Sequence, residues 1–175
     1  CVGEKSANEA YMVTTKNTPV AINASYINSE VSVASSTTVS YIQFLTLPAA
    51  SEGVLYYDYK SAYSYSHLVS TDYQYAYTSG TYTIGKVSFV PTTGFTGNVA
   101  IPYAAYNVYG NLVYVGEMSI GVVNTKYSYS DVAATAWYYK YVTELSDAKV
   151  VNGYPNGSFK PTANVSYGEA LKLIL

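Results

Sequence analysis

The stretch "GNVAIPYAAYNVYGNLVYVGEMSIGVV", residues 97–123, decides the fold of this chain. Apolar residues alternate with other residues in Gly97–Asn107 and again in Leu112–Val123, as they do in strands with one buried face. In the first segment the in-phase residues are Val99, Ile101, Tyr103 and Ala105. Between the two segments, "YNVYGN" offers Gly110 or Asn111 for the positive φ of a tight turn. The stretch therefore predicts a β-hairpin.

Four other segments also read as strands: Thr18–Ala24, Thr38–Pro48, Gly53–Tyr59 and Gly85–Pro91. Both parities of Thr38–Pro48 carry large apolar groups, so we expect that strand to be covered on two sides. At least one more strand is expected in the first residues or in a later tyrosine-rich stretch. About seven short strands at a spacing of roughly ten residues are typical of a β-sandwich.

The composition agrees with an all-β body and excludes two partner classes. Hydrophobic residues make up 49% of the 175 residues and charged residues only 11%, while tyrosine occurs 23 times. All basic residues are lysines spread along the chain and the net charge is −2, so we expect no nucleic-acid partner. Because no run of about 18 apolar residues occurs, we expect no membrane span. The single cysteine, Cys1, has three readings: a remnant of trimming, an intermolecular disulfide, or a lipid-modified N-terminus.

The tyrosine-rich stretch Tyr59–Thr83 is the least regular part of the chain, with one short strand expected around His67–Ser70. Tyrosine is large and stiff and has a polar tip, so this stretch can form a contact surface for sugar or for a neighbouring subunit. The alternative is that tyrosine serves as a half-wet strand residue in a chain poor in charge. The candidate contact residues are Tyr63, Tyr65, Tyr73, Tyr75 and Tyr77.

Nothing in the sequence predicts catalysis. His67 is the only histidine, so we expect no metal site and no cofactor. Asp58 and Asp72 flank the tyrosine-rich stretch, and paired carboxylates can hydrolyse glycosides, but no further acidic cluster supports that reading. Phosphate-binding and dinucleotide-binding motifs are missing from the sequence. We therefore expect a non-enzymatic protein.

After about Thr125 the pattern changes from strand to helix. Thr135–Ala148 places Trp137, Tyr141, Val142 and Leu145 on one side at helical spacing, with Thr135 as the expected N-cap. A loop with a Pro-Asn-Gly turn follows. Ser166-Tyr167-Gly168-Glu169 is then a capping box that starts a second apolar helix. Two short helices bury little by themselves and need a neighbour, as repeat units do.

This C-terminal region, about 129–175, resembles the S-layer homology (SLH) motif. The matching elements are Tyr129-Ser130-Asp131-Val132, Trp137-Tyr138, Tyr141-Val142, Leu145, Gly153-Tyr154-Pro155-Asn156-Gly157-Ser158-Phe159-Lys160-Pro161, Val165-Ser166 and Glu169-Ala170. The resemblance implies an extracellular protein of the bacterial cell wall or S-layer. In that family three motifs pack as a pseudo-threefold prong, whose grooves hold pyruvylated secondary polymers of the wall.

Two departures from the family pattern bear on binding. The chain carries one motif, so it is either a fragment or assembles prongs from several chains, as a homo-oligomer or lattice. The family's arginine at the second helix start is Tyr167 here, and a phenol lacks the charge and the forked donors of a guanidinium. Lys160 is the nearest cation. The candidate docking residues, for wall polymer or subunit, are Asp131, Trp137, Gly153, Lys160, Tyr167 and Glu169.

Each of these residues also has a structural reading. Asp131 contacts a sugar or caps the turn into the helix, and Trp137 stacks on a sugar or belongs to the core. Gly153, together with Gly157, is expected to adopt positive φ. Glu169 completes the capping box.

The preceding region resembles, more weakly, the immunoglobulin-like or cadherin-like repeats of bacterial surface proteins. The resemblance is carried by Phe89-Val90-Pro91, Gly94-Phe95-Thr96-Gly97, Ile101-Pro102-Tyr103 and Tyr106-Asn107 with Gly110-Asn111. We therefore expect a mainly β chain: an immunoglobulin-like β-sandwich in residues 1–124 and a single helix-loop-helix SLH unit in residues 125–175.

Three functional hypotheses follow. The first is a non-enzymatic structural protein of the cell surface, an S-layer or S-layer-associated component, whose SLH unit docks to wall polymer or to neighbouring subunits. The second is a self-assembling extracellular filament or sheath subunit. The third is a carbohydrate-binding adhesin that uses the tyrosine-rich stretch.

Overall fold

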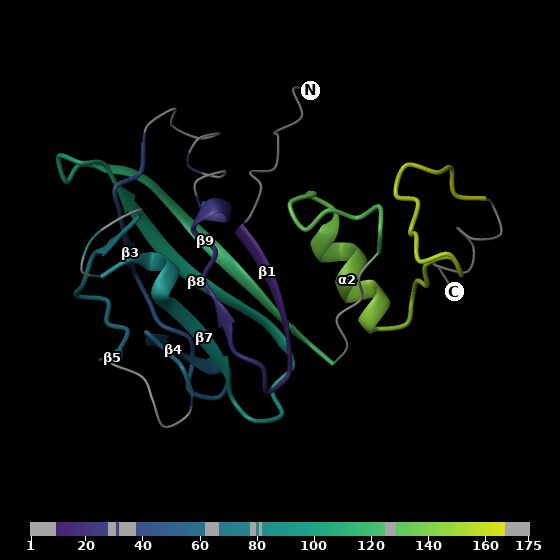
Figure 1. Ribbon diagram of the computed structural model, residues 1–175, viewed down its shortest axis with the longest axis horizontal. Helices are drawn as coiled ribbons and strands as arrows, with labels where there is room; N and C mark the ends of the chain where they lie inside the picture. Colours follow the sequence, from purple (N-terminus) through teal and green to yellow (C-terminus); the bar gives the residue numbers. More distant parts are fainter. Residues whose placement is uncertain are drawn as a thin grey trace.

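The computed structural model describes residues 10–27, 31, 38–61, 67–77, 80, 82–124 and 129–166. These residues form a mainly β structure with few helices, as the alternating sequence pattern predicts. Two sheets, a short 3-10 helix (η1, Ile84–Lys86) and one α-helix (α2, Tyr139–Asp147) make up the named elements, and residues 24–27 add a helical turn. Figure 1 shows the strands gathered on one side and α2 with the C-terminal loop on the other.

The larger sheet has the strand order β1-β9-β8-β3-β6. Its strands are β1 (Ala10–Thr15), β9 (Leu112–Val123), β8 (Gly97–Tyr106), β3 (Tyr41–Phe44) and β6 (Tyr75–Ala76). The hairpin predicted from residues 97–123 is confirmed: β8 pairs antiparallel with β9, from Gly97 opposite Val122 to Tyr106 opposite Leu112. Gly110 takes the positive φ, 77°, in the connecting turn. The edge strand β1 pairs with β9 in the parallel sense.

The smaller sheet has the order β2-β7-β4-β5 and is antiparallel where the register is given. Its strands are β2 (Val20–Ala21), β7 (Val87–Pro91), β4 (Gly53–Tyr57) and β5 (His67–Leu68). β5 lies where the short strand around His67–Ser70 was predicted. β2 is much shorter than the predicted segment Thr18–Ala24.

One hydrophobic core joins the two sheets. Val99, Ile101, Tyr103 and Ala105 of β8, which the sequence placed in phase, are all fully buried. They lie in one cluster with Leu55 of β4 and Phe89 of β7, from the opposite sheet. Burial of these apolar surfaces is the main term that stabilises the arrangement. That the layers follow an immunoglobulin-like connection remains a prediction.

The expectation for Thr38–Pro48 is wrong in one respect. Ile42 and Phe44 of β3 are fully buried, but Leu45 and Leu47 are exposed. The strand is therefore covered well on one side only. Leu45 still donates a backbone hydrogen bond to Pro102 of β8 at 2.9 Å, but its side chain and that of Leu47 point to solvent.

The outer face of the larger sheet is partly covered by α2. Tyr11 and Val13 of β1 and Val123 of β9 form a second, small cluster against which Tyr139 packs. The rings of Tyr11 and Tyr139 meet edge to face with centroids 6.3 Å apart, and the Lys140 ammonium lies 5.5 Å from the centre of the Tyr11 ring. In addition, the Asn124 backbone N–H donates to the Asp147 carboxylate at 3.2 Å. The C-terminal segment, residues 129–166, therefore contacts the body formed by the two sheets, called here the β-body, through one side of α2.

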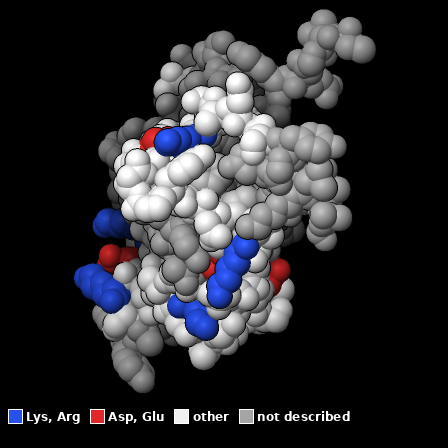
Figure 2. Space-filling model, turned by 90° about the vertical axis from the view of Figure 1, so that its right-hand side faces the viewer, with Lys and Arg blue, Asp and Glu red and all other residues white. Residues whose placement is uncertain are grey.

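The surface is poor in charge, in keeping with the composition. On the face in Figure 2, a few lysine and carboxylate side chains are scattered among described residues that carry no charge. Within the described residues, no helix has the length and apolar character needed to cross a membrane.

Candidate functional site

Tyr129, at the start of the C-terminal segment, joins helix α2 to the loop that follows it. Its hydroxyl group shares a hydrogen bond of 2.9 Å with Ser146 of α2 and accepts the backbone N–H of Gly153 at 3.2 Å. Its ring packs on Phe159 with centroids 5.2 Å apart. One phenol thus sets where the loop from 153 to 160, called here the 153–160 loop, lies relative to α2.

Gly153 is required for a reason that differs from the prediction. Its φ is not positive; positive φ among nearby glycines occurs at Gly157, with 78°. Instead, a Cβ at Gly153 would overlap the Tyr129 ring and would lie 2.8 Å from the Ser158 carbonyl oxygen. Because glycine has no side chain, the Tyr129 ring fits against Gly153. The spacing of residues in the sequence does not reveal this contact.

Asp131 fastens the 153–160 loop from the other end. Its two carboxylate oxygens accept the backbone N–H groups of Phe159 and Lys160, each at 2.7 Å. These bonds, with that from Phe159 first, favour the charged form and lower the pKa of the Asp131 carboxyl group. The expectation that Asp131 caps the turn into the helix is therefore wrong, because the carboxylate binds backbone N–H groups of a loop 28 and 29 residues away.

Lys160 presents its charge next to an aromatic ring. Its ammonium nitrogen lies 4.4 Å from the centre of the Tyr154 ring, a cation–π distance. Lys160 has a φ of 57° and an exposed side chain. The arrangement gives the outer side of the 153–160 loop a cation beside an aromatic face.

The helix begins later than predicted. α2 starts at Tyr139, four residues after Thr135, and its N-cap is Tyr138, which makes no side-chain capping bond. The residues between form turns in which Ala136 N–H donates to Ala133 and Tyr139 N–H to Ala136. Thr135 is therefore not the cap, and Trp137 lies just before the helix.

Three large side chains on one side of this region are left uncovered. Trp137, Tyr141 and Leu145, spaced four residues apart, are 73%, 55% and 41% exposed. We call these three residues the apolar stripe. The core reading of Trp137 is wrong, since its side chain is largely exposed and the aromatic rings that it meets, Tyr138 and Tyr141, belong to the same segment. In contrast, Val142, Thr143 and Ser146 on the other side of α2 are buried.

Several predicted residues lie outside the described part of the chain. They are Cys1, Tyr63, Tyr65, Tyr167 and Glu169, together with the second helix expected from Ser166.

The remaining candidate tyrosines differ in position. Tyr73 is exposed, Tyr77 is half-buried and Tyr75 is fully buried. Burial raises the pKa of Tyr75 and of Tyr77, and the Tyr75 hydroxyl accepts the Ser70 backbone N–H at 3.3 Å. Tyr75 and Tyr77 therefore belong to the body of the domain rather than to an exposed contact loop.

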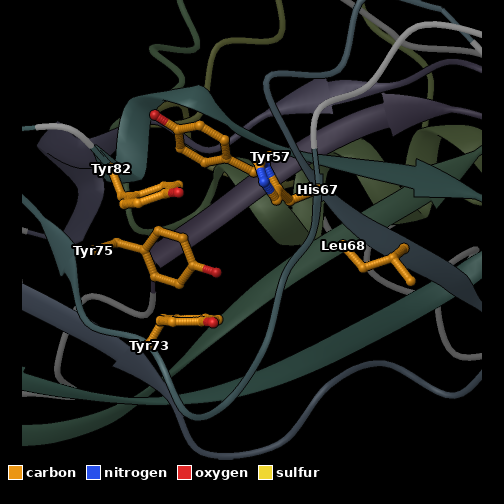
Figure 3. A pocket seen from close by; sticks show the side chains of 6 residues that line it. All are labelled: Tyr57, His67, Leu68, Tyr73, Tyr75 and Tyr82. Atoms are coloured by element: carbon orange, nitrogen blue, oxygen red, sulfur yellow. The ribbon is translucent and has the colours of Figure 1, made fainter.

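A cavity of about 140 Å³ lies beside Tyr73 and Tyr75. Its other walls are Tyr57, His67, Leu68 and Tyr82, shown in Figure 3. The candidate residues chosen from the sequence did not include these four, because the strands that bring them together are set by tertiary pairing. His67, Leu68 and Tyr82 do lie in the stretch Tyr59–Thr83, which the sequence offered as a contact surface, whereas Tyr57 lies outside it.

The two carboxylates considered for glycoside hydrolysis make separate contacts. Asp58 pairs with Lys60 at 3.9 Å, and Asp72 closes a local turn by accepting the Ser70 hydroxyl at 3.2 Å. Among the described residues, no three histidine, cysteine, aspartate or glutamate side chains gather in a way that could hold a metal ion.

Known proteins resemble the C-terminal segment. Residues 128–171 match the S-layer homology domain. Over 48 residues the chain is 40% identical to the middle cell wall protein of Brevibacillus brevis and to the surface layer protein of Brevibacillus choshinensis. These matches cover 27% of this chain but only 5% and 4% of those proteins, so the chain spans a small part of their length. No solved structure matches. The SLH motif predicted from the residues is thereby confirmed for 128–171, and this segment is the part of the chain that the S-layer homology family accounts for.

Proposed function

We propose that this chain is part of a non-enzymatic structural protein of the bacterial cell surface, an S-layer or S-layer-associated component located at the wall. The S-layer homology segment is its docking unit and the β-body acts as a spacer or lattice contact. Support comes from the family match at 128–171 and from the cell-wall and surface-layer names of the two relatives.

The observation that carries the proposal is the apolar stripe. Contiguous exposed apolar groups on a soluble surface mark sites where something else docks. Trp137, Tyr141 and Leu145 stay exposed although α2 has already used its other side to pack within the chain. The β-body therefore does not occupy the surface that the segment offers.

The proposed occupants are a secondary cell-wall polysaccharide, including a pyruvylated one, or an SLH segment of another copy. An aromatic stripe suits both, because it stacks on sugar rings as well as on apolar side chains. Lys160 beside Tyr154 supplies a positive charge for an anionic polymer at the edge of the 153–160 loop. Docking between copies would make the protein a homo-oligomer or a lattice.

The stripe also favours a second candidate, the self-assembling filament or sheath subunit. Copy-to-copy contact through exposed helices builds an open chain when the contact is not closed by symmetry. In that case the measured mass rises with protein concentration in sedimentation equilibrium. A strict monomer at all concentrations, with and without reductant, removes this candidate.

Co-sedimentation with purified Gram-positive wall sacculi tests wall docking. The full chain is expected to pellet with sacculi that retain their secondary polymer and to stay in solution with sacculi stripped of it by acid. A Trp137→Ser, Tyr141→Ser variant loses pelleting. The control Tyr109→Ser, at a residue that is 85% exposed in the β8–β9 turn, pellets like the parent chain. Equal pelleting with both kinds of sacculi would contradict polymer docking.

A further inference from the structure

A cavity at the opposite side of the β-body from α2 is built almost entirely of aromatic side chains. Tyr57 ends β4, His67 and Leu68 form β5, and Tyr75 begins β6. Tyr73 and Tyr82 complete the lining. Figure 1 shows β5 on the side of the sheets away from α2, so this cavity is separate from the apolar stripe.

The walls include two roughly parallel rings. The rings of Tyr73 and Tyr82 lie 19° from parallel with centroids 6.4 Å apart, and both residues are exposed, at 62% and 43%. Tyr75, which is 2% exposed, also lines the cavity, and its ring lies between those of Tyr73 and Tyr82 in the view of Figure 3. His67 stands at 82° to Tyr82 with the ring centroids 6.0 Å apart.

Polar tips converge on the same space. Figure 3 shows the hydroxyl groups of Tyr73, Tyr75 and Tyr82 pointing toward the strand that carries His67 and Leu68. Tyr75 already accepts a bond from Ser70, whereas no hydrogen bond among the described residues involves the hydroxyl groups of Tyr73 and Tyr82. Each of those phenols can donate one hydrogen bond and accept others.

Size and charge narrow the class of ligand. A cavity of about 140 Å³ has room for one six-membered ring, since an engineered cavity of roughly 150 Å³ takes up benzene. The described lining residues are tyrosines, one histidine and one leucine, with no carboxylate, lysine or arginine among them, and the ammonium of Lys86 lies 6.0 Å from the centre of the Tyr57 ring. A ring with an apolar face and polar edges, and without a positive charge, suits this lining.

We propose that this cavity binds one neutral pyranose unit of a glycan, with a sugar face against the Tyr73 or Tyr82 ring and sugar hydroxyls bonded to the phenols and to His67. A pyranose presents C–H groups on its faces and hydroxyls at its rim, which matches aromatic walls with polar tips. An aromatic side chain from a protein partner would fill the space, but it carries no rim of hydroxyl groups to bond with the converging phenols. This site goes beyond the docking role of the SLH segment and uses none of its residues.

Ligand-observed NMR and calorimetry on the full chain test the proposal. The probes are the methyl glycosides of glucose, mannose and N-acetylglucosamine, and a neutral wall polysaccharide freed of its pyruvate groups. At least one glycoside is expected to bind in a saturable way. Binding of the polysaccharide as well identifies the wall as the source, and binding of the simple glycosides alone points to a glycan from elsewhere.

Variants locate the binding in this cavity. Tyr82→Ala and Tyr73→Ala each remove one wall and weaken glycoside binding about tenfold. Tyr82→Phe keeps the wall and loses one hydroxyl, so its affinity falls less. Tyr109→Ala, a matched exposed tyrosine outside the cavity, and Trp137→Ala, in the apolar stripe, leave glycoside binding unchanged. Circular dichroism checks that each variant is folded, and Tyr73→Ala keeps the test valid if Tyr82→Ala does not fold.

Three results would overturn the proposal: no saturable binding of any probe, binding by both alanine variants that is as tight as that of the parent chain, or binding of p-cresol without binding of any glycoside. The last would assign the cavity to an aromatic side chain of a protein partner. If Tyr82→Ala loses glycoside binding but still pellets with sacculi like the parent chain, the cavity and the SLH docking surface are separate sites.

Discussion

At the scale of single residues, Gly153 shows how closely the C-terminal segment is packed. The ring of Tyr129 occupies the place where a Cβ would be. We expect Gly153→Ala to lower the free energy of unfolding by about 1–3 kcal/mol, because the ring or the loop must move. Chemical denaturation followed by circular dichroism measures the change.

Gly85→Ala is the matched control for that substitution. A Cβ at Gly85 meets no atom within 4 Å, so its stability should change little or rise slightly. Equal stability of the two alanine variants would show that the Tyr129–Gly153 contact is not tight in solution.

The lowered pKa of Asp131 predicts how the stability of the folded chain changes in acid. Its pKa is lowered in the folded chain, first by the Phe159 N–H bond, so its contribution to stability is fully present above the unfolded pKa of about 3.9. The contribution is lost as pH falls from there through the folded pKa. NMR titration should show the amide signals of Phe159 and Lys160 shifting together, with a midpoint below about 3.9.

The Asp131→Asn variant controls the titration. An amide keeps one acceptor oxygen and carries no titratable charge, so the two amide signals should no longer respond in this pH range. A midpoint at or above about 3.9 in the parent chain would mean that the carboxylate does not hold the 153–160 loop.

At the scale of elements, the two sides of α2 should respond differently to mutation. Val142→Ala removes buried methyl groups and should lower the free energy of unfolding by about 2 kcal/mol. Tyr141→Ser, at the preceding residue but on the exposed side, should change the free energy of unfolding by no more than about 0.5 kcal/mol. Thermal unfolding compares the two. A large loss for Tyr141→Ser would mean that the stripe is covered within the chain.

The hairpin β8–β9 could be predicted from sequence because its signal is local. Alternation places Val99 and Ile101 on one face, and Gly110 supplies the turn. The start of α2 could not be predicted in the same way. Thr135 is a suitable cap by residue type, but the backbone around it forms turns, in which the Ala136 N–H donates to Ala133. The helix begins only at Tyr139, which packs on Tyr11.

The candidate site could be predicted where its signal is local and could not be predicted where it depends on tertiary contacts. The SLH loop follows a linear motif, so Asp131, Gly153 and Lys160 could be named, although the partner of Asp131 and the crowding at Gly153 depend on tertiary contacts. The tyrosine-rich stretch Tyr59–Thr83 marked the region of the cavity, because His67 and Tyr82 lie in it. Which of its side chains line the cavity, and that Tyr57 of β4 joins them, depends on how the strands pair.

At the scale of the whole molecule, the chain offers two surfaces on different sides of a shared β core. One is the apolar stripe of the SLH segment, and the other is the tyrosine-lined cavity near β5 (Figures 1 and 3). Because charged residues make up only 11% of the chain, we propose that both surfaces recognise their partners mainly through aromatic and hydroxyl groups. With the proposed docking at one surface and the proposed glycan binding at the other, the chain would link the wall to a further layer.

The central claim is that the stripe is open in the free chain and becomes covered on docking, and the single tryptophan reports on it directly. Trp137 fluorescence should be red-shifted and readily quenched by acrylamide in dilute protein, because the ring is 73% exposed. Titration with solubilised wall polymer, or a rise in protein concentration, should shift the emission to shorter wavelength and protect it from quencher. Emission that is already blue and protected in dilute protein, or that stays unchanged while the chain binds polymer or its own copies, would contradict the account.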